Sequence, residues 1–228
     1  MRLNRTGAVA GALYFVIGLG WLWLGKPDNP WLAGAWLAIV AVVGCAIPGV
    51  ANHVSLARAY LAAPAFVYAL AGEYGFLALA VAIAGLTDLV DGTIARRLAQ
   101  PTSLGGGLDP VVDGLFMGAL CVGLALGGAM PLWLALVVIG RYLLPALGGG
   151  VLLAAGRRPE LRHTVTGQVS TTLILFLVGG VCLLRGLQQP SAEFLAAAEV
   201  VIPLATVATF VHLGWAAVRR PARVAEAG

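Results

Sequence analysis

Long apolar runs separated by short polar stretches make up most of this chain. Eight runs approach the ~20 residues that a helix needs to cross a bilayer core. They cover residues 7–25, 31–50, 54–73, 75–97, 109–128, 131–156, 166–188 and 195–218. The pattern predicts an all-α integral membrane protein with eight transmembrane helices. We expect a two-helix membrane extension over residues 1–49, a six-helix core over 50–220 and a short disordered tail over 221–228.

Composition supports a membrane protein and excludes a soluble one. Of the 228 residues, 60% are hydrophobic and only 11% are charged, and the mean hydropathy is +0.93. No soluble domain of this size needs such a balance to fill its core. The net charge of +4 could indicate nucleic-acid binding, but the basic residues form short clusters between apolar runs. This fits loops at an anionic bilayer surface better, so we expect a lipid partner and no nucleic acid.

The distribution of Lys and Arg among alternate loops predicts the topology. Eleven basic residues, Arg58 among them, fall on the side of the N-terminus and two, Lys26 and Arg185, on the other. Arg141 falls within a span. Because the side richer in basic residues is usually cytoplasmic, we expect both termini and the Arg96 to Gly107 loop to lie in the cytoplasm. We expect the protein itself to lie in the inner or plasma membrane.

Four of the chain's five aspartates lie in the short stretch from Asp88 to Asp113. Asp88 and Asp91 are three residues apart, and Asp109 and Asp113 are four apart, so on helices each pair projects from one face. Helix capping would explain one or two of these carboxylates but not all four. Four carboxylates in an apolar setting require either protonation or a divalent cation, and oxygen ligands favour magnesium, manganese or calcium over zinc.

The residues between the two aspartate pairs point to a phosphate-bearing ligand. Gly92 and Ala95 leave a helix face almost without side chains, and Arg96 provides a guanidinium fork suited to phosphate. Small residues at this spacing also occur in ordinary helix packing, which is the alternative explanation. A glycine-rich loop, Thr102 to Gly107, follows. Together with the aspartates, these parts indicate a metal-bound diphosphate.

The whole stretch resembles the signature of the CDP-alcohol phosphotransferases, membrane enzymes of phospholipid synthesis. The matching pattern reads Asp88-x2-Asp91-Gly92-x2-Ala95-Arg96-x8-Gly105-x3-Asp109-x3-Asp113. Upstream, Asn52-x2-Ser55-x2-Arg58 is similar to the family's Pro-Asn-x2-Thr-x2-Arg, with Ala51 where the proline is usual. The resemblance covers roughly residues 50 to 220 and leaves the two N-terminal helices without a counterpart.

The resemblance implies a set of site residues and cofactors. Two divalent ions, Mg²⁺ or Mn²⁺, would be held by Asp88, Asp91, Asp109 and partly Asp113, with Asp113 also acting as general base. The implied CDP-binding residues are Asn52, Ser55, Gly92, Ala95, Arg96, Thr102 and Gly105. The family's habit further implies a homodimer.

The acceptor site is less defined by sequence. Arg141 lies deep in a span, where it either snorkels to an interface or faces a cavity and binds an anion. Arg158 and His163 are the other candidate acceptor-binding residues. The segment Gly167 to Thr171 is similar to Gly-Lys-x-Lys-Thr of phosphatidylglycerophosphate synthase relatives, but both lysines are absent. Gly114 stands where a basic residue is usual, so whether the acceptor is phosphorylated stays open.

The sequence therefore predicts an enzyme that transfers a phosphatidyl group from CDP-diacylglycerol to an alcohol and releases CMP. Glycerol 3-phosphate is the first acceptor we expect, with inositol phosphate or an unphosphorylated polyol next. A cation or proton-coupled transporter is the alternative from another class. Transport would favour acidic residues spread over several helices, whereas here the four aspartates fall within 26 consecutive residues beside an arginine and a glycine-rich loop.

Overall fold

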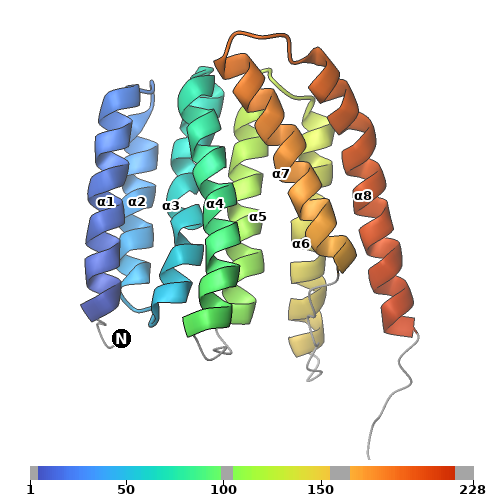
Figure 1. Cartoon of the computed structure of the whole chain (residues 1–228), viewed down its shortest axis with the longest axis horizontal. Coiled ribbons are helices and arrows are strands. Elements are labelled where there is room, and N and C mark those ends of the chain that lie inside the picture. The colour runs from blue at the N-terminus through green and yellow to red at the C-terminus, as the bar shows by residue number, and fades with distance from the viewer. Residues whose placement is uncertain (1–4, 99–104, 155–164, 219–228) are drawn as a thin grey trace, which may run out of the picture.

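The fold is a bundle of eight helices within the part of the chain that the structure describes (Figure 1). The computed structural model describes the backbone of residues 5–98, 105–154 and 165–218, and the side chains there except those of 50–51, 88–98, 105–107, 109, 146, 149–154, 165, 168 and 216–218. The helices are α1 (Arg5–Gly25), α2 (Pro30–Gly44), α3 (Val50–Ala71), α4 (Tyr74–Leu98), α5 (Gly105–Leu126), α6 (Leu132–Ala154), α7 (Val165–Gly186) and α8 (Ala192–Val218).

The all-helical architecture predicted from the apolar runs is confirmed. Four stretches within α1, α3, α7 and α8 are long and apolar enough to cross a bilayer. The described apolar parts of the other four helices are shorter, namely Pro30–Gly44, Tyr74–Thr87, Pro110–Leu126 and Leu132–Pro145. The division into an extension and a six-helix core stays a prediction.

Two helix boundaries differ from those predicted. The second helix ends at Gly44 rather than near residue 50, and the chain turns through Gly49, whose φ of 94° favours glycine. Residues 105–107, predicted as part of the glycine-rich loop from Thr102 to Gly107, instead form the first turn of α5. The first N–H groups of a helix need no partner within the helix, so a glycine-rich start is compatible with helix formation there.

Helix α3 lies at the centre of the bundle. It contacts α1, α2, α4 and α5, and 78% of its spanning stretch is buried, against 22% for α1 and for α8. Its sequence is rich in alanine, so neighbouring helices approach its backbone closely. The closest neighbour is α5: a Cβ at Gly123 would lie 2.8 Å from the backbone oxygen of Phe66. The α3–α5 contact therefore depends on small residues on both helices.

Helix α1 packs against α2 and α3 through a face rich in glycine. Its buried residues are Gly7, Gly11, Gly18, Leu22 and Gly25. A Cβ at Gly7 would lie 2.7 Å from the Gly44 backbone oxygen of α2, and a Cβ at Gly25 would overlap the Tyr68 ring of α3. Tyr68 also donates a hydrogen bond of 2.9 Å to the Trp21 backbone oxygen. Helix α1 is thus fitted to α3, the helix at the centre of the bundle.

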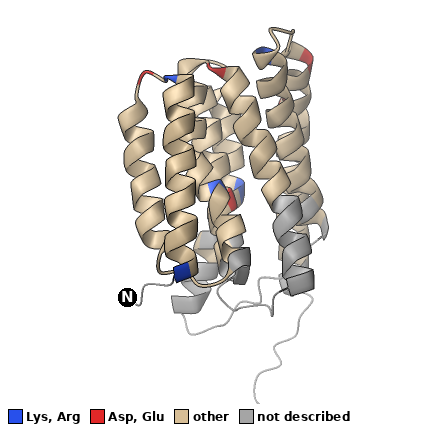
Figure 2. Ribbon diagram, turned by 60° about the vertical axis from the view of Figure 1, so that its left-hand side comes forward, with Lys and Arg blue, Asp and Glu red and all other residues tan. Residues whose placement is uncertain are grey.

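Charged residues divide between the ends of the bundle and a small group inside it. Figure 2 shows blue and red positions at one end, a blue position at the end that holds the N-terminus, and a cluster near the middle. The end of α4 and the start of α5 lie at the same end of the bundle as the N-terminus (Figure 1). Since charges are costly within a bilayer unless they are paired or functional, the inner group marks the candidate site.

Candidate active site

The inner charges centre on an ion pair between Arg58 of α3 and Asp113 of α5. Nη1 of Arg58 lies 2.6 Å from Oδ1 of Asp113, and the two side chains are 4% and 22% exposed. Burying a charge without a partner is costly, and removing one member of a buried pair typically costs about 3–5 kcal/mol. The close approach of α3 and α5 is therefore what places Asp113 beside its counter-charge.

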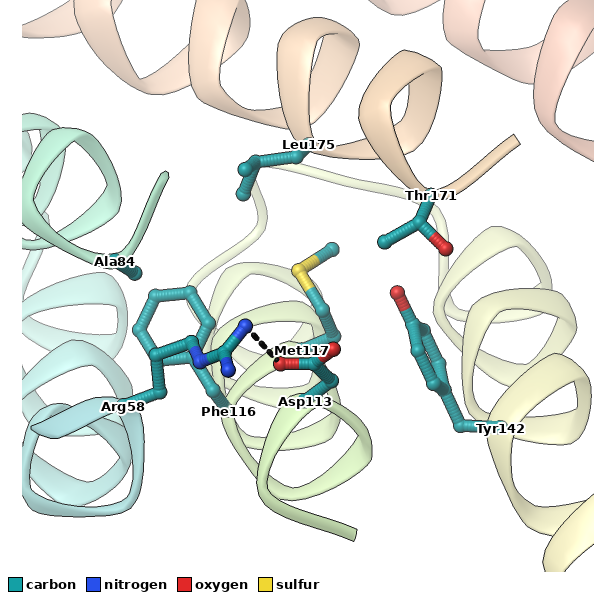
Figure 3. A pocket seen from close by; sticks show the side chains of 8 residues that line it. All are labelled: Arg58, Ala84, Asp113, Phe116, Met117, Tyr142, Thr171 and Leu175. Atoms are coloured by element: carbon teal, nitrogen blue, oxygen red, sulfur yellow. Dashed lines mark ion pairs between the residues drawn. The ribbon is translucent and has the colours of Figure 1, made fainter. Parts of the chain in front are cut away.

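Asp113 borders a small pocket to which five helices contribute. Its lining residues are Arg58, Ala84, Asp113, Phe116, Met117, Tyr142, Thr171 and Leu175, from α3, α4, α5, α6 and α7 (Figure 3). The free space is about 20 Å³, enough for little more than one water molecule. The described residues thus form only one wall of any site that holds a lipid headgroup.

Arg141 of α6 is buried and joins that helix to the start of α7. Its Nε donates to Oγ of Ser170 at 3.1 Å, and its Nη2 donates to the Gly167 oxygen at 2.9 Å and to Oγ1 of Thr171 at 3.0 Å. The side chain is only 7% exposed, so it does not snorkel to an interface. Among the described residues its hydrogen-bond partners are all neutral, which leaves the positive charge available to an anion.

Tyr142 occupies the space beside Gly114. A Cβ at Gly114 would lie 3.1 Å from Cβ of Tyr142, tighter than most real contacts. The absence of a side chain at position 114 therefore makes room for this tyrosine. The Tyr142 hydroxyl is buried and points toward Thr171 (Figure 3). The guanidinium of Arg141 lies 5.1 Å from the centre of the Tyr142 ring.

The other three signature aspartates are placed by their helices alone. Asp88 and Asp91 lie on α4, one and two turns beyond the pocket-lining Ala84, and Asp109 lies on α5 one turn before Asp113. Gly92, Ala95 and Arg96 follow on α4, and Gly105 begins α5. Their side chains are outside the described set, as are Thr102, Arg158 and His163 altogether. Among the described side chains alone, no group of three or more metal-ligating residues occurs.

The predicted nucleotide-binding residues of α3 are buried near its start. Asn52 is 5% exposed and its Nδ2 donates to the Pro48 oxygen at 2.7 Å. This hydrogen bond ties the turn before α3 to its first residues. Ser55 is also buried, one turn before Arg58. Both residues thus lie on the helix that carries Arg58, but their role in CDP binding stays a prediction.

Arg58 is a site residue to which the sequence interpretation gave no role beyond its place in the motif. It was counted among the basic residues on the N-terminal side, whereas it lies well inside α3 and is 3% exposed. The available signal was its spacing, because Asn52, Ser55 and Arg58 recur every three residues and an apolar run continues beyond them. A charge at helical spacing within an apolar run is better explained as an internal pair than as a loop residue.

A family model matches most of the chain at the residues that build this site. The CDP-alcohol phosphatidyltransferase model matches residues 49–213, which include all four signature aspartates, Arg58 and Arg141. The chain therefore belongs to the CDP-alcohol phosphatidyltransferase family, and it is a multi-pass membrane protein. The match starts at Gly49, after the end of α2 at Gly44 and one residue before α3 begins.

Curated relatives within the family carry two kinds of name. The chain is 39% identical to a cardiolipin synthase (CMP-forming) of Streptomyces coelicolor over 37% of this chain and 40% of the relative. It is 35% identical to a putative cardiolipin synthase of Mycobacterium tuberculosis over 62% and 66% of the two chains. A probable phosphatidylglycerophosphate synthase of the same organism is 30% identical over 57% and 61%.

These matches cover less than two thirds of each relative's own length. No solved structure matches the chain.

Proposed function

We propose that this protein transfers a phosphatidyl group from CDP-diacylglycerol to the hydroxyl of a glycerol-based acceptor and releases CMP. The observation that carries the proposal is the position of Asp113. This signature carboxylate borders a pocket reached by five helices and lies one turn from a second signature aspartate on α5. A carboxylate in such a position can accept the proton of an attacking hydroxyl.

In the proposed reaction, the acceptor oxygen attacks the phosphorus that carries diacylglycerol. The bond from this phosphorus to the bridging oxygen breaks, and CMP leaves with that oxygen. The hydroxyl proton passes to a carboxylate oxygen of Asp113. No covalent intermediate with the protein is needed, because a single displacement balances both bonds and the proton.

The donor set fits hard divalent ions. Asp88 and Asp91 follow Ala84 of the pocket wall at helical spacing, and Asp109 precedes Asp113 in the same way, so the two proposed carboxylate pairs would lie on the helix faces that continue from the pocket. Carboxylate oxygens are the ligands that Mg²⁺ and Mn²⁺ prefer. When bound, two such ions would neutralise the diphosphate and the leaving phosphate.

We propose phosphatidylglycerol as the acceptor, ahead of glycerol 3-phosphate, the first expectation from sequence. Phe116, Met117 and Leu175 give the pocket beside Asp113 an apolar wall, which suits an acceptor presented from the bilayer. The names of the cardiolipin synthase relatives support the same choice. Arg141 has neutral partners among the described residues and would bind the acceptor's phosphate.

Topology is part of the proposal. With Arg58 and Arg141 both inside helices, ten basic residues lie on the side of the N-terminus and two on the other. This asymmetry favours a cytoplasmic N-terminus and a cytoplasmic α4–α5 connection. The site would then open to the compartment that supplies magnesium. A homodimer remains a prediction from the family resemblance.

An acceptor screen with purified protein in vesicles tests the proposed function. Labelled CDP-diacylglycerol is offered with phosphatidylglycerol, glycerol 3-phosphate, inositol phosphate or no acceptor, and the lipid product and CMP are separated. We expect CMP and a four-chain phospholipid with phosphatidylglycerol. If a lipid product forms only with glycerol 3-phosphate, that compound and not phosphatidylglycerol is the acceptor. No turnover of CDP-diacylglycerol with any acceptor would reject the proposed activity.

A further inference from the structure

Asp113 has two roles that conflict in the proposed reaction: it is the counter-ion of Arg58, and it is a proposed metal ligand and proton acceptor. Arg58 is 3% exposed within an apolar helix, so its positive charge needs a close anion. The carboxylate of Asp113 provides one, with Nη1 and Oδ1 2.6 Å apart (Figure 3). Yet Asp113 is also the residue assigned to hold metal and to accept a proton.

A divalent cation and the guanidinium repel each other when both approach one carboxylate. The two positive charges would lie within a few ångströms of each other in a site with little water, where their interaction is poorly screened. When the guanidinium and the cation share Asp113, either the ion pair or the binding of the metal is therefore weakened. The carboxylate is 22% exposed, so an incoming cation can reach it, while Arg58 is almost fully enclosed.

We propose that Arg58 is an internal counter-ion that pairs with Asp113 in the metal-free protein and competes with the divalent cation for that carboxylate. The inference rests on the proposed function, because it takes Asp113 as a metal ligand. Arg58 is then a positioning residue: it holds the carboxylate in place and makes its burial in the apolar bundle less costly until metal arrives. The ion pair thus stabilises the metal-free protein and lowers its affinity for the metal.

A purely structural ion pair makes a different prediction, and this difference allows a test. Replacing a structural arginine lowers stability and leaves metal binding unchanged or weaker, because the carboxylate loses its position. Replacing a competing arginine lowers the stability of the metal-free protein but strengthens metal binding. Metal affinity measured without substrate therefore separates the two roles, independently of enzyme activity.

The experiment is a Mn²⁺ titration of the full chain in detergent, with free Mn²⁺ followed by electron paramagnetic resonance. Arg58→Gln should bind Mn²⁺ about tenfold more tightly than wild type, since a contact charge in a poorly solvated site is removed. Arg58→Lys keeps a charge but loses the planar fork, and should give about a threefold gain. Arg141→Gln removes another buried guanidinium, whose partners are neutral, and should change the affinity by less than about twofold.

A double-mutant cycle checks that the effect acts through Asp113. Asp113→Asn removes the shared carboxylate, so adding Arg58→Gln to it should no longer strengthen Mn²⁺ binding. In thermal melts, Mn²⁺ should raise the melting temperature of Arg58→Gln more than that of wild type, because a ligand stabilises the folded protein more when it binds more tightly.

Three results would overturn the inference in distinguishable ways. If wild type binds Mn²⁺ and Arg58→Gln binds it with equal or lower affinity, the ion pair is structural only and the proposed function stays intact. A gain that persists in the Asp113→Asn background would show that Arg58 acts elsewhere. Failure of wild type and all variants to bind Mn²⁺ would remove the metal site itself and the proposed function with it. If Arg58→Gln does not fold, Arg58→Lys decides: equal or weaker binding than wild type contradicts the competition.

Discussion

Asp113 is the residue on which the proposed chemistry depends, because it is the described signature carboxylate at the pocket. Asp113→Asn keeps the size of the side chain and one ligand oxygen but cannot accept a proton. Turnover should fall by roughly 10² to 10⁴, as expected for a lost general base, while CDP-diacylglycerol affinity stays close to wild type. Steady-state kinetics with a substrate-binding assay measures both quantities.

Asp91→Asn is the matched comparison on α4. This substitution removes charge from the proposed metal set, so nucleotide binding should weaken together with turnover and recover partly at high magnesium. A magnesium titration of both variants makes the contrast visible. If Asp113→Asn loses substrate affinity and recovers with magnesium in the same way as Asp91→Asn, Asp113 acts only as a ligand.

Arg141 gives a second prediction at the residue scale. Arg141→Gln should raise the KM for the acceptor about tenfold to a hundredfold, the effect of losing charge-assisted hydrogen bonds, and leave CDP-diacylglycerol affinity unchanged. Arg185→Gln is the control, since Arg185 is also a basic residue of a bundle helix but bonds to Ser191 and Tyr74 at the other end of α7. Equal effects of the two substitutions would exclude Arg141 from the acceptor site.

Residue identities within the motif were readable from the sequence, but side-chain partnerships were not. The spacing of the aspartates predicted two helical pairs, and both pairs lie on helices. The pairing of Arg58 with Asp113 joins residues 55 positions apart, so only the packing of α3 against α5 brings it about. The partners of Arg141 on α7 are unpredictable for the same reason.

At the scale of elements, the contact between α3 and α5 positions the site. Gly123→Leu should disrupt it, because even a Cβ there would lie 2.8 Å from the Phe66 oxygen and the Ala69 Cβ. Overpacking of this kind costs about 1–3 kcal/mol, so the melting temperature and turnover should both fall.

Gly118→Leu on the same helix is the matched control. No atom lies within 4 Å of a Cβ built at Gly118, so the substitution should leave melting temperature and activity near wild type. Comparable losses in the two variants would show that leucine is harmful on α5 in general, and that the close contact at Gly123 is not the cause.

Helix number was predictable from the sequence because apolar runs of spanning length are unambiguous in this composition. Helix ends were less predictable. The glycines at 105–107 were predicted to lie in the loop between the aspartate pairs, whereas the structure begins α5 there. The glycine face of α1 was equally hidden, because its role appears only where α2 and α3 pack against it.

At the scale of the whole molecule, topology decides which side supplies the substrates. After Cys45, Cys121 and Cys182 are replaced by Ala, a single cysteine at Ser103 should react with an impermeant thiol reagent from the cytoplasmic side only. A single cysteine at Lys26, in the exposed α1–α2 turn, should react only from the opposite side. Labelling in sealed right-side-out and inverted vesicles measures both. If the two cysteines react from the opposite sides, the predicted topology is wrong.

The central claim is that a carboxylate-bound divalent ion supports phosphatidyl transfer in this bundle, and chelation tests it most directly. CMP release from labelled CDP-diacylglycerol is followed for the wild-type protein with saturating acceptor, first in EDTA and then after addition of magnesium or manganese. Because four carboxylates cannot bind or activate a diphosphate without cations, we expect release to stop in EDTA and to return with either metal. Full CMP release in the presence of the chelator would contradict the account.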